Sequence, residues 1–300
     1  MLDLIIIGAG PAGITAAVYA ARKKMNLLVI TNDIGGQTAW SGDIENYTGY
    51  QFVSGPELVA KFEEHLRKYD ITLKENEPVI ELIKRGDVIF VKTDKGSYEA
   101  KAVIIASGKR SKELGVPGEK EFKNKGLTYC ATCDGPLFAG KDVAVIGGGN
   151  SALDAALQLM KIAKSVYIVN VASGITGDAI MLEKLANNGN VSILNNSRVI
   201  AVSGKKFVNS IRINSGQEEK EVPVEGIFVE IGLIPNSGFV KDIKKNGLGE
   251  IEVDNYNRTG VPGIFAAGDV TDVPEKQIII AAGEGAKATL GAFRYLSKIR

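Results

Sequence analysis

The two cysteines of the chain, Cys130 and Cys133, are separated by two residues and followed at once by Asp134. Two thiols at this spacing can close and reopen a disulfide, and the second thiol can resolve mixed disulfides formed by the first. A neighbouring carboxyl group can take a proton from a thiol or give one to a thiolate. The pattern favours a redox-active thiol pair with an acid beside it.

Two other interpretations of the pair stay open: half of a zinc site, or two buried small apolar residues. Zinc needs four ligands, and the chain has only one histidine, His65. A site of four cysteines, or of two cysteines and two histidines, is therefore excluded within the chain. His65 lies in a charged stretch, where we expect it to be solvated. Asp134 has an alternative role as the cap of the segment that follows it.

Two glycine-rich turns flank the cysteine pair. The first is Gly8-x-Gly10-x-x-Gly13 and the second is Gly147-x-Gly149-x-x-Ala152. Glycines in such a turn permit a tight bend and let the backbone approach a pyrophosphate, and the following helix N-terminus attracts the phosphates. Each turn therefore predicts a dinucleotide-type unit.

The flanking segments support this interpretation, because each turn lies between an apolar strand and a helix, and a second strand follows the helix. The predicted strands and helices of the two units are Leu4–Ile7, Ala12–Lys24, Asn26–Thr31, Val143–Ile146, Ser151–Ala163 and Ser165–Val169. Between the units, Val88–Thr93 and Tyr98–Ala106 predict an added β-layer. We expect an α/β fold of two Rossmann-like three-layer β/β/α domains, the second inserted into the first.

The expected domain boundaries follow from segments that break regular structure. Leu114–Gly118 contains two glycines and a proline and is a candidate hinge, and the polar segment Lys241–Gly249 precedes a predicted strand, Glu250–Val253. We therefore predict a first part of the first domain at 1–112, the inserted domain at 113–241 and the second part at 242–300.

Composition excludes some classes of partner. The chain has 36 basic and 35 acidic residues, so no global charge favours nucleic acid or an anionic membrane. No stretch of 18 uncharged apolar residues is present, and the chain opens directly on an apolar strand. We expect a soluble, cytoplasmic protein.

Other residues suit a flavin dinucleotide. Amide side chains can bind the edge of a flavin ring, and an aspartate at the end of a short buried strand can accept from ribitol hydroxyls. Asp33 lies near the distance of a ribose acid, but the predicted strand ends at Thr31, so we expect no such contact. The predicted cofactor-binding residues are Gly8, Gly10, Pro11, Ala12, Gly13, Thr31, Gly35, Gly36, Gln37, Asn46, Gly108, Gly268, Asp269, Gln277 and Ile278.

From end to end, the chain resembles the low-molecular-weight bacterial thioredoxin reductases. The segments that carry the resemblance are 8–13, 35–37, 130–134, 147–152 and 268–269. The resemblance implies a homodimer with one FAD per subunit and an inserted domain that rotates between a flavin-facing and a thioredoxin-facing state. It also implies that Cys133 exchanges electrons with the flavin, that Cys130 attacks thioredoxin and that Asp134 is the acid.

The second unit departs from the usual pattern. NADPH-dependent members carry a His-Arg-Arg type segment where this chain has Asn170-Val171-Ala172, which also lacks an acid for a ribose. Losing two charged contacts to a phosphate costs about 3 to 6 kcal/mol. In this respect the chain most resembles the ferredoxin-dependent flavin thioredoxin reductases, so we expect ferredoxin as the electron donor.

Two alternatives to that function stay open. One is an NAD(P)H-dependent thioredoxin reductase with an atypical nucleotide site that draws on Lys205, Lys206 and Arg212. The other is a flavin-binding redox sensor that controls a partner without turnover.

Overall fold

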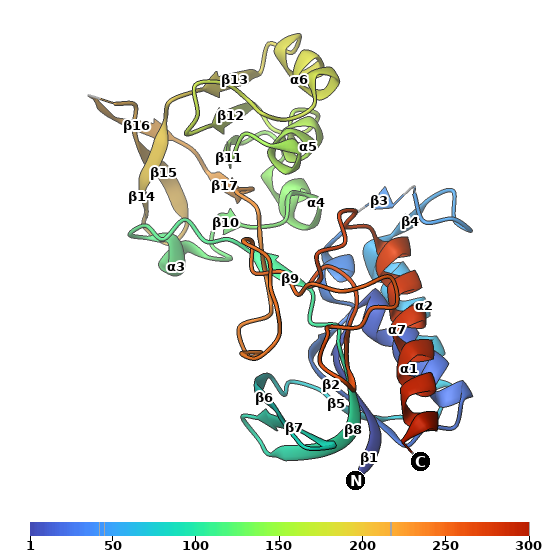
Figure 1. The fold of residues 1–300 in the computed structure, drawn as a ribbon. Helices are drawn as coiled ribbons and strands as arrows, with labels where there is room; N and C mark the ends of the chain where they lie inside the picture. The colour runs from blue at the N-terminus through green and yellow to red at the C-terminus, as the bar shows by residue number, and fades with distance from the viewer. Residues whose placement is uncertain (42, 45, 217, 300) are drawn as a thin grey trace. The chain divides into compact units, whose positions relative to one another are not determined.

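The structure is a computed structural model that describes residues 1–41, 43–44, 46–216 and 218–299. The side chains of Trp40, Asp43, Thr132 and Cys133 lie outside the described part. The chain divides into two compact units, the first made of Met1–Arg110 and Ile234–Arg300 and the second of Ser111–Leu233 (Figure 1). The predicted fold class is confirmed.

The first unit is organised around parallel strands. Their order is β5-β2-β1-β8, with β19 on the other side of β8. The bounds are β1 Leu2–Ala9, β2 Leu27–Ile34, β5 Thr72–Lys74, β8 Ser97–Ile105 and β19 Ile264–Ala266. Because these strands are parallel, their carboxyl ends lie at one edge of the sheet.

Helices cover one face of this sheet and a β-meander covers the other (Figure 1). The helices are α1 Pro11–Arg22, α2 Gly55–Arg67 and α7 Ile278–Lys298, and the meander pairs β6 Val79–Arg85 and β7 Val88–Thr93 with the first half of β8. Leu4 and Ile6 pack in the core below the helices, while Ile5 and Ile7 pack in the core towards the meander. Burial on both faces explains the continuous apolar run of β1.

Two glycines allow close packing, one of α7 on α1 and one of α1 on β1. A Cβ atom on Gly285 would lie 2.0 Å from the carbonyl oxygen of Ala12, and one on Gly13 would lie 1.9 Å from that of Gly8. The third glycine of the first turn therefore lets the helix approach the strand, as the sequence predicts.

The remaining elements of the first unit are short. They are η1 Gly36–Trp40, β3 Asp43–Ile44, β4 Val53–Ser54, and the two strands where the chain passes between units, β9 Lys109–Ser111 and β18 Leu233–Pro235. Helix α2 begins with a capping box, in which Ser54 N donates to Glu57 Oε2 at 3.0 Å.

The second unit has a parallel sheet in the order β10-β17-β11-β12-β13 and an antiparallel sheet in the order β14-β15-β16. The strands are β10 Leu127–Thr128, β11 Asp142–Ile146, β12 Ser165–Val169, β13 Val191–Leu194, β14 Arg198–Gly204, β15 Val208–Asn214, β16 Glu219–Pro223 and β17 Gly226–Val229. The helices are α3 Glu119–Phe122, α4 Ala131–Asp134, η2 Gly135–Phe138, α5 Asn150–Leu159 and α6 Ala179–Ala186.

Two details differ from expectation. The chain re-enters the first unit at Ile234, before the predicted residue 242, because Leu82 N donates to Phe239 O at 3.2 Å and Val240 packs in the first unit's core. The segment predicted as the strand 250–253 forms only isolated bridges at Ile251. No helix among the described residues is both long and apolar enough to cross a membrane.

Candidate functional site

The parallel sheet of the first unit brings several predicted residues to one edge. The Gly8–Gly10 turn lies at the end of β1, Thr31 lies near the end of β2, and Gly268 and Asp269 follow β19. Ligands in open α/β sheets bind at the carboxyl ends of the strands. This edge is therefore the candidate dinucleotide site.

The helix N-termini at this edge suit a phosphate. Gly10 is the N-cap of α1 and Gln277 is the N-cap of α7, and neither helix has a side-chain hydrogen bond at its N-cap. A Cβ atom on Gly10 would contact only Gly35 O, at 3.9 Å, so the backbone is open to close approach. Free N–H groups and the helix dipole favour an anion here, which fits the pyrophosphate of FAD.

Hydrogen bonds fix the shape of this edge. Thr31 Oγ1 accepts from Ala9 N at 3.1 Å and donates to Asp33 O, while Gly35 N donates to Ala9 O at 2.7 Å. The Thr31 hydroxyl therefore holds the ends of β1 and β2 together. Gly36 and Gln37 continue from this point into η1.

Two predicted residues far apart in the sequence meet directly. Asn46 Nδ2 donates to Gln277 Oε1 at 3.1 Å. Ile278 begins α7 beside them. Gly108 has a φ of +62°, and its carbonyl accepts from Asn236 N at 2.9 Å. Asn236 thus ties the end of the first chain segment to the returning one.

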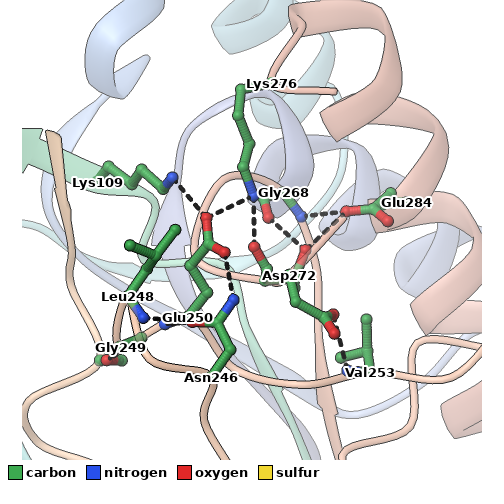
Figure 2. Close-up of polar contacts among 12 residues, drawn as sticks. Lys109, Asn246, Leu248, Gly249, Glu250, Val253, Gly268, Asp272, Lys276 and Glu284 are labelled. Atoms are coloured by element: carbon green, nitrogen blue, oxygen red, sulfur yellow. Dashed lines mark hydrogen bonds and ion pairs between the residues drawn. The ribbon is translucent and has the colours of Figure 1, made fainter. Parts of the chain in front are cut away.

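A network of buried charges surrounds the Gly268-Asp269 turn (Figure 2). Gly268 N donates to Glu284 Oε2 at 2.8 Å, and Glu284 is 5% exposed. Burial raises the pKa of Asp269, and the positive charges of Lys276 and Lys109 oppose that rise. A carboxyl group in this position can bind hydroxyl groups of a ligand.

Glu250 is the centre of this network. Its carboxylate binds Lys109 at 2.7 Å, Lys276 at 3.1 Å and Asn246 Nδ2 at 2.6 Å (Figure 2). Burial alone would raise the pKa of Glu250, but these hydrogen bonds lower it to about 2. Glu250, Lys109 and Lys276 are not among the residues predicted from the sequence to bind a cofactor. Only Lys109 could have been found from the sequence, because it follows the predicted residue Gly108.

The predicted redox residues lie in residues 128–134 of the second unit, a segment that includes the short helix α4 and is called the redox loop below. Cys130 follows β10 and is disulfide-bonded, while the side chain of Cys133 lies outside the described residues. Thr128 Oγ1 donates to Asp134 Oδ2 and accepts from Cys130 N at 3.2 Å. Asp134 N donates to Cys130 O at 3.2 Å. Asp134 is the N-cap of η2 but makes no side-chain cap, so the capping interpretation of its carboxylate is wrong.

The side chain of Tyr129, which precedes Cys130, is also fixed by a hydrogen bond. Its hydroxyl donates to Glu119 Oε1 at 2.8 Å, and Glu119 also accepts from Leu114 N at 2.6 Å and Gly115 N at 2.7 Å. Burial and the adjacent carboxylate raise the pKa of Tyr129. Glu119 therefore joins the candidate hinge segment to the redox loop.

In the second glycine turn, the position of the missing ribose acid is taken by Asn170. Its Nδ2 donates to Ala172 O, Gly174 O and Asn195 Oδ1 at 2.9 to 3.2 Å, and its Oδ1 accepts from Ala172 N. Asn170 is only 4% exposed, and both its Nδ2 and its Oδ1 are hydrogen-bonded inside the protein.

Glu230 lies on the other side of this turn. A Cβ atom on Gly147 would lie 2.2 Å from Glu230 O. Burial raises the pKa of Glu230 to about 7, while a hydrogen bond with Ser151 lowers it and the charge of Asp154 raises it. Ser151 is in the first turn of α5, so this carboxyl group lies at the helix end where a phosphate would bind.

The alternative nucleotide residues are not gathered at this turn. Lys205 and Lys206 lie between β14 and β15, where Val208 N donates to Lys125 O, and Arg212 pairs with Glu219 at 3.8 Å. His65 is exposed in α2. Among the described residues, no group of three or more His, Cys, Asp or Glu could hold a metal ion.

Residues 2–285 match the pyridine nucleotide-disulphide oxidoreductase family. Two curated relatives are an NADH dehydrogenase of Bacillus subtilis, 42% identical over 298 residues, and a component of the alkyl hydroperoxide reductase of Pseudomonas aeruginosa, 43% identical over 302 residues. Both alignments cover 98% of this chain and 58% of the relative. The chain thus spans little more than half the length of these relatives.

Solved structures match over nearly the whole chain. Lactococcus lactis thioredoxin reductase is 35% identical with a TM-score of 0.88, covering 99% of this chain and 100% of the other. The T. acidophilum thioredoxin reductase is 37% identical with a TM-score of 0.85, covering 100% and 99%. A ferredoxin-flavin thioredoxin reductase from Clostridium acetobutylicum is 32% identical with a TM-score of 0.56, covering 99% and 98%.

Proposed function

Because the chain belongs to the pyridine nucleotide-disulphide oxidoreductase family, we propose that it is a thioredoxin-disulfide reductase. In this role two electrons from reduced ferredoxin reach the Cys130–Cys133 pair and then the disulfide of thioredoxin. The family and its thioredoxin reductase members bind FAD. Bound FAD supplies the chemistry that joins one-electron donation to two-electron reduction of a disulfide.

The observation that carries the proposal is the redox loop. Cys130 is disulfide-bonded, and the main chain and hydroxyl contacts around it hold Asp134 in the same loop. Disulfide exchange needs a nucleophilic thiol, a resolving thiol and a group that moves a proton. In the first unit, the turn residues Gly8 to Gly13, Asp269 and the N-terminus of α7 are the groups that would hold FAD.

The second glycine turn supports ferredoxin as the donor. The amide group of Asn170 is buried and hydrogen-bonded inside the protein and offers no carboxylate to a ribose, and Glu230 adds a carboxyl group at the N-terminus of α5, where a pyrophosphate would lie. The likeness to a structure named as a ferredoxin-flavin thioredoxin reductase is consistent with this donor. A ferredoxin near about −400 mV can reduce a thioredoxin near about −270 mV.

A second candidate keeps a nicotinamide donor. It is favoured by the relatives named as an NADH dehydrogenase and as part of an alkyl hydroperoxide reductase, which are 42% and 43% identical to this chain. In that case the donor would be NADH. Its adenosine ribose would be bound by residues other than Asn170, which has no carboxylate.

One experiment separates these candidates. The FAD-loaded protein is mixed rapidly with reduced ferredoxin, NADH or NADPH, and loss of the oxidised flavin absorbance is followed. We expect fast reduction by ferredoxin and none by micromolar nicotinamide nucleotides. Fast reduction by NADH would replace ferredoxin with the second candidate. Multiple turnovers of thioredoxin reduction with any donor would exclude a sensor that acts without turnover, and gel filtration would test the proposed homodimer.

A further inference from the structure

Thr128 is the last residue of β10, two positions before Cys130, and is 6% exposed. Its hydroxyl contacts two groups, Asp134 Oδ2 and Cys130 N. A backbone N–H can only donate, so the hydroxyl accepts from Cys130. The single hydrogen of the hydroxyl is then directed to the Asp134 carboxylate. The direction of both hydrogen bonds is therefore fixed by the chemistry of the partners.

The Asp134 carboxylate is held by one oxygen. Oδ2 accepts from Thr128, and no hydrogen bond from the described part of the chain reaches Oδ1. The main-chain N–H of Asp134 is fixed separately by Cys130 O. Without the hydroxyl, the carboxylate could rotate about its Cβ–Cγ bond. Thr128 therefore selects which oxygen is available to exchange a proton.

We propose that Thr128 is a positioning residue that orients Asp134 for proton transfer during thiol–disulfide exchange. The inference rests on the proposed function, in which Asp134 is the acid next to the redox pair. A group held in a productive orientation avoids an entropic cost in the reaction. In this role Thr128 acts through Asp134.

In the reduced enzyme, exchange begins with Cys130 as the thiolate and Cys133 as the thiol. The thiolate of Cys130 attacks the acceptor disulfide, so a mixed disulfide forms and one acceptor thiolate leaves. Asp134 takes the proton of the Cys133 thiol and passes it through Oδ1 to the leaving thiolate. The Cys133 thiolate then attacks the mixed disulfide, which closes the enzyme disulfide and releases the second acceptor sulfur. The enzyme dithiol is oxidised and the acceptor disulfide is reduced.

Two variants separate the hydroxyl from the shape of the side chain. Thr128→Val keeps the shape and removes both hydrogen bonds, and Thr128→Ser keeps the hydroxyl. The proteins are reduced with dithiothreitol, desalted and mixed with an alkyl disulfide such as oxidised glutathione. We expect Thr128→Val to slow the first exchange step roughly 10- to 100-fold, the loss of one hydrogen bond to a charged group. Thr128→Ser should stay within about twofold of wild type.

An aromatic disulfide gives a second readout. Its thiolate has a low pKa and leaves without a proton, so its rate should be the same in wild type and Thr128→Val. In an Asp134→Asn background, Thr128→Val should cause no further loss with the alkyl disulfide. If Thr128 had only a structural role, Thr128→Val would slow exchange with both disulfides. The same loss of rate would also appear in the Asp134→Asn background. Thr128→Ala provides a second variant without the hydroxyl should Thr128→Val fail to fold.

The proposal is overturned by equal alkyl-disulfide rates in wild type and Thr128→Val, or by the same loss in both Asp134 backgrounds. Chemical reduction bypasses the electron donor, and the small disulfides do not require thioredoxin to be the natural acceptor. A wild-type protein that exchanges with them but not with thioredoxin would count against the proposed function and leave the Thr128 comparison valid.

Discussion

Lys109 Nζ lies 2.7 Å from Glu250 Oε1, although the second unit separates the two residues in the sequence. Their side chains are 11% and 8% exposed, so the pair is shielded from water. It joins the two chain segments that make up the first unit.

Lys109→Met should destabilise the first unit. Glu250 keeps Lys276 as a second cation, so its buried charge is left only partly compensated, and the loss should be smaller than the cost of about 3 to 5 kcal/mol for a fully broken buried pair. Lys244 forms a similar but exposed pair with Glu252, so Lys244→Met should cause no measurable change. Urea unfolding of both variants tests this. Equal midpoints for Lys109→Met and wild type would mean that Lys276 alone satisfies Glu250.

The carboxylate of Glu250 should account for part of the dependence of folding stability on pH in the acid range. Its folded pKa of about 2 lies below the ordinary value of 4.5. Its contribution is therefore complete above about pH 4.5 and is lost as the pH falls through about 2. Glu250→Gln should remove this part of the pH dependence, measured as the free energy of unfolding between pH 6 and pH 2, roughly the range in which carboxylates titrate.

Glu230 should give the free energy of unfolding the opposite dependence on pH. Its folded pKa of about 7 is above the ordinary 4.5, so its contribution is complete below about pH 4.5 and is lost as the pH rises through about 7. Glu230→Gln should therefore gain stability relative to wild type between these limits, by up to about 3 kcal/mol. Glu225→Gln, at an exposed position of the same unit, is the control. A constant difference between Glu230→Gln and wild type across this range would contradict the prediction.

Asp269→Ala should weaken FAD retention. If the carboxylate accepts from a cofactor hydroxyl, its loss costs about 1.5 to 3 kcal/mol, or roughly 10- to 100-fold in affinity. The ratio of flavin to protein absorbance after dialysis measures this. Glu275→Gln, at an exposed position nearby, should retain FAD like wild type.

Cys130→Ser should separate the two thiol roles. The flavin should still be reduced by the electron donor, whereas thioredoxin reduction should be lost because the attacking thiol is absent. Steady-state thioredoxin reduction and rapid-mixing flavin reduction are compared on the same preparation. Normal turnover of the variant would mean that Cys133 attacks thioredoxin.

Asp134→Asn should slow exchange with thioredoxin about 10²- to 10⁴-fold if Asp134 is the main acid. The amide keeps the size of the side chain but cannot carry the proton. Single-turnover mixing of the reduced variant with oxidised thioredoxin provides the rate. A rate near that of wild type would assign the proton transfer to water.

Local patterns predicted much of the fold. The bounds of β7 and β12 agree with the structure, because each is a short apolar or alternating run. The glycine turns and their helices were also predictable, since the required residues are adjacent in the sequence. The segment 250–253 has the pattern of a strand but forms no ladder, because only Ile251 meets a neighbouring segment.

The charged network of the site could not be predicted. Lys109, Glu250 and Lys276 come together only through the tertiary fold, and isolated charged residues have no periodic signal. Thr128 was missed for a related reason, because nothing in a Thr-Tyr-Cys sequence shows that its hydroxyl turns towards Asp134. The sequence shows that Asn170 stands where an acid for a ribose is expected. Only the structure shows that its amide group is hydrogen-bonded inside the protein.

Glu119 is only 2% exposed, and its carboxylate accepts from Leu114 N, Gly115 N and the hydroxyl of Tyr129. A twist of the backbone at Leu114 or Gly115 would break a hydrogen bond to this buried carboxylate. The carboxylate thereby ties the main chain at Leu114 and Gly115 to the residue that precedes Cys130, all within the second unit. A longer chain before Leu114 should therefore leave the geometry around Cys130 unchanged.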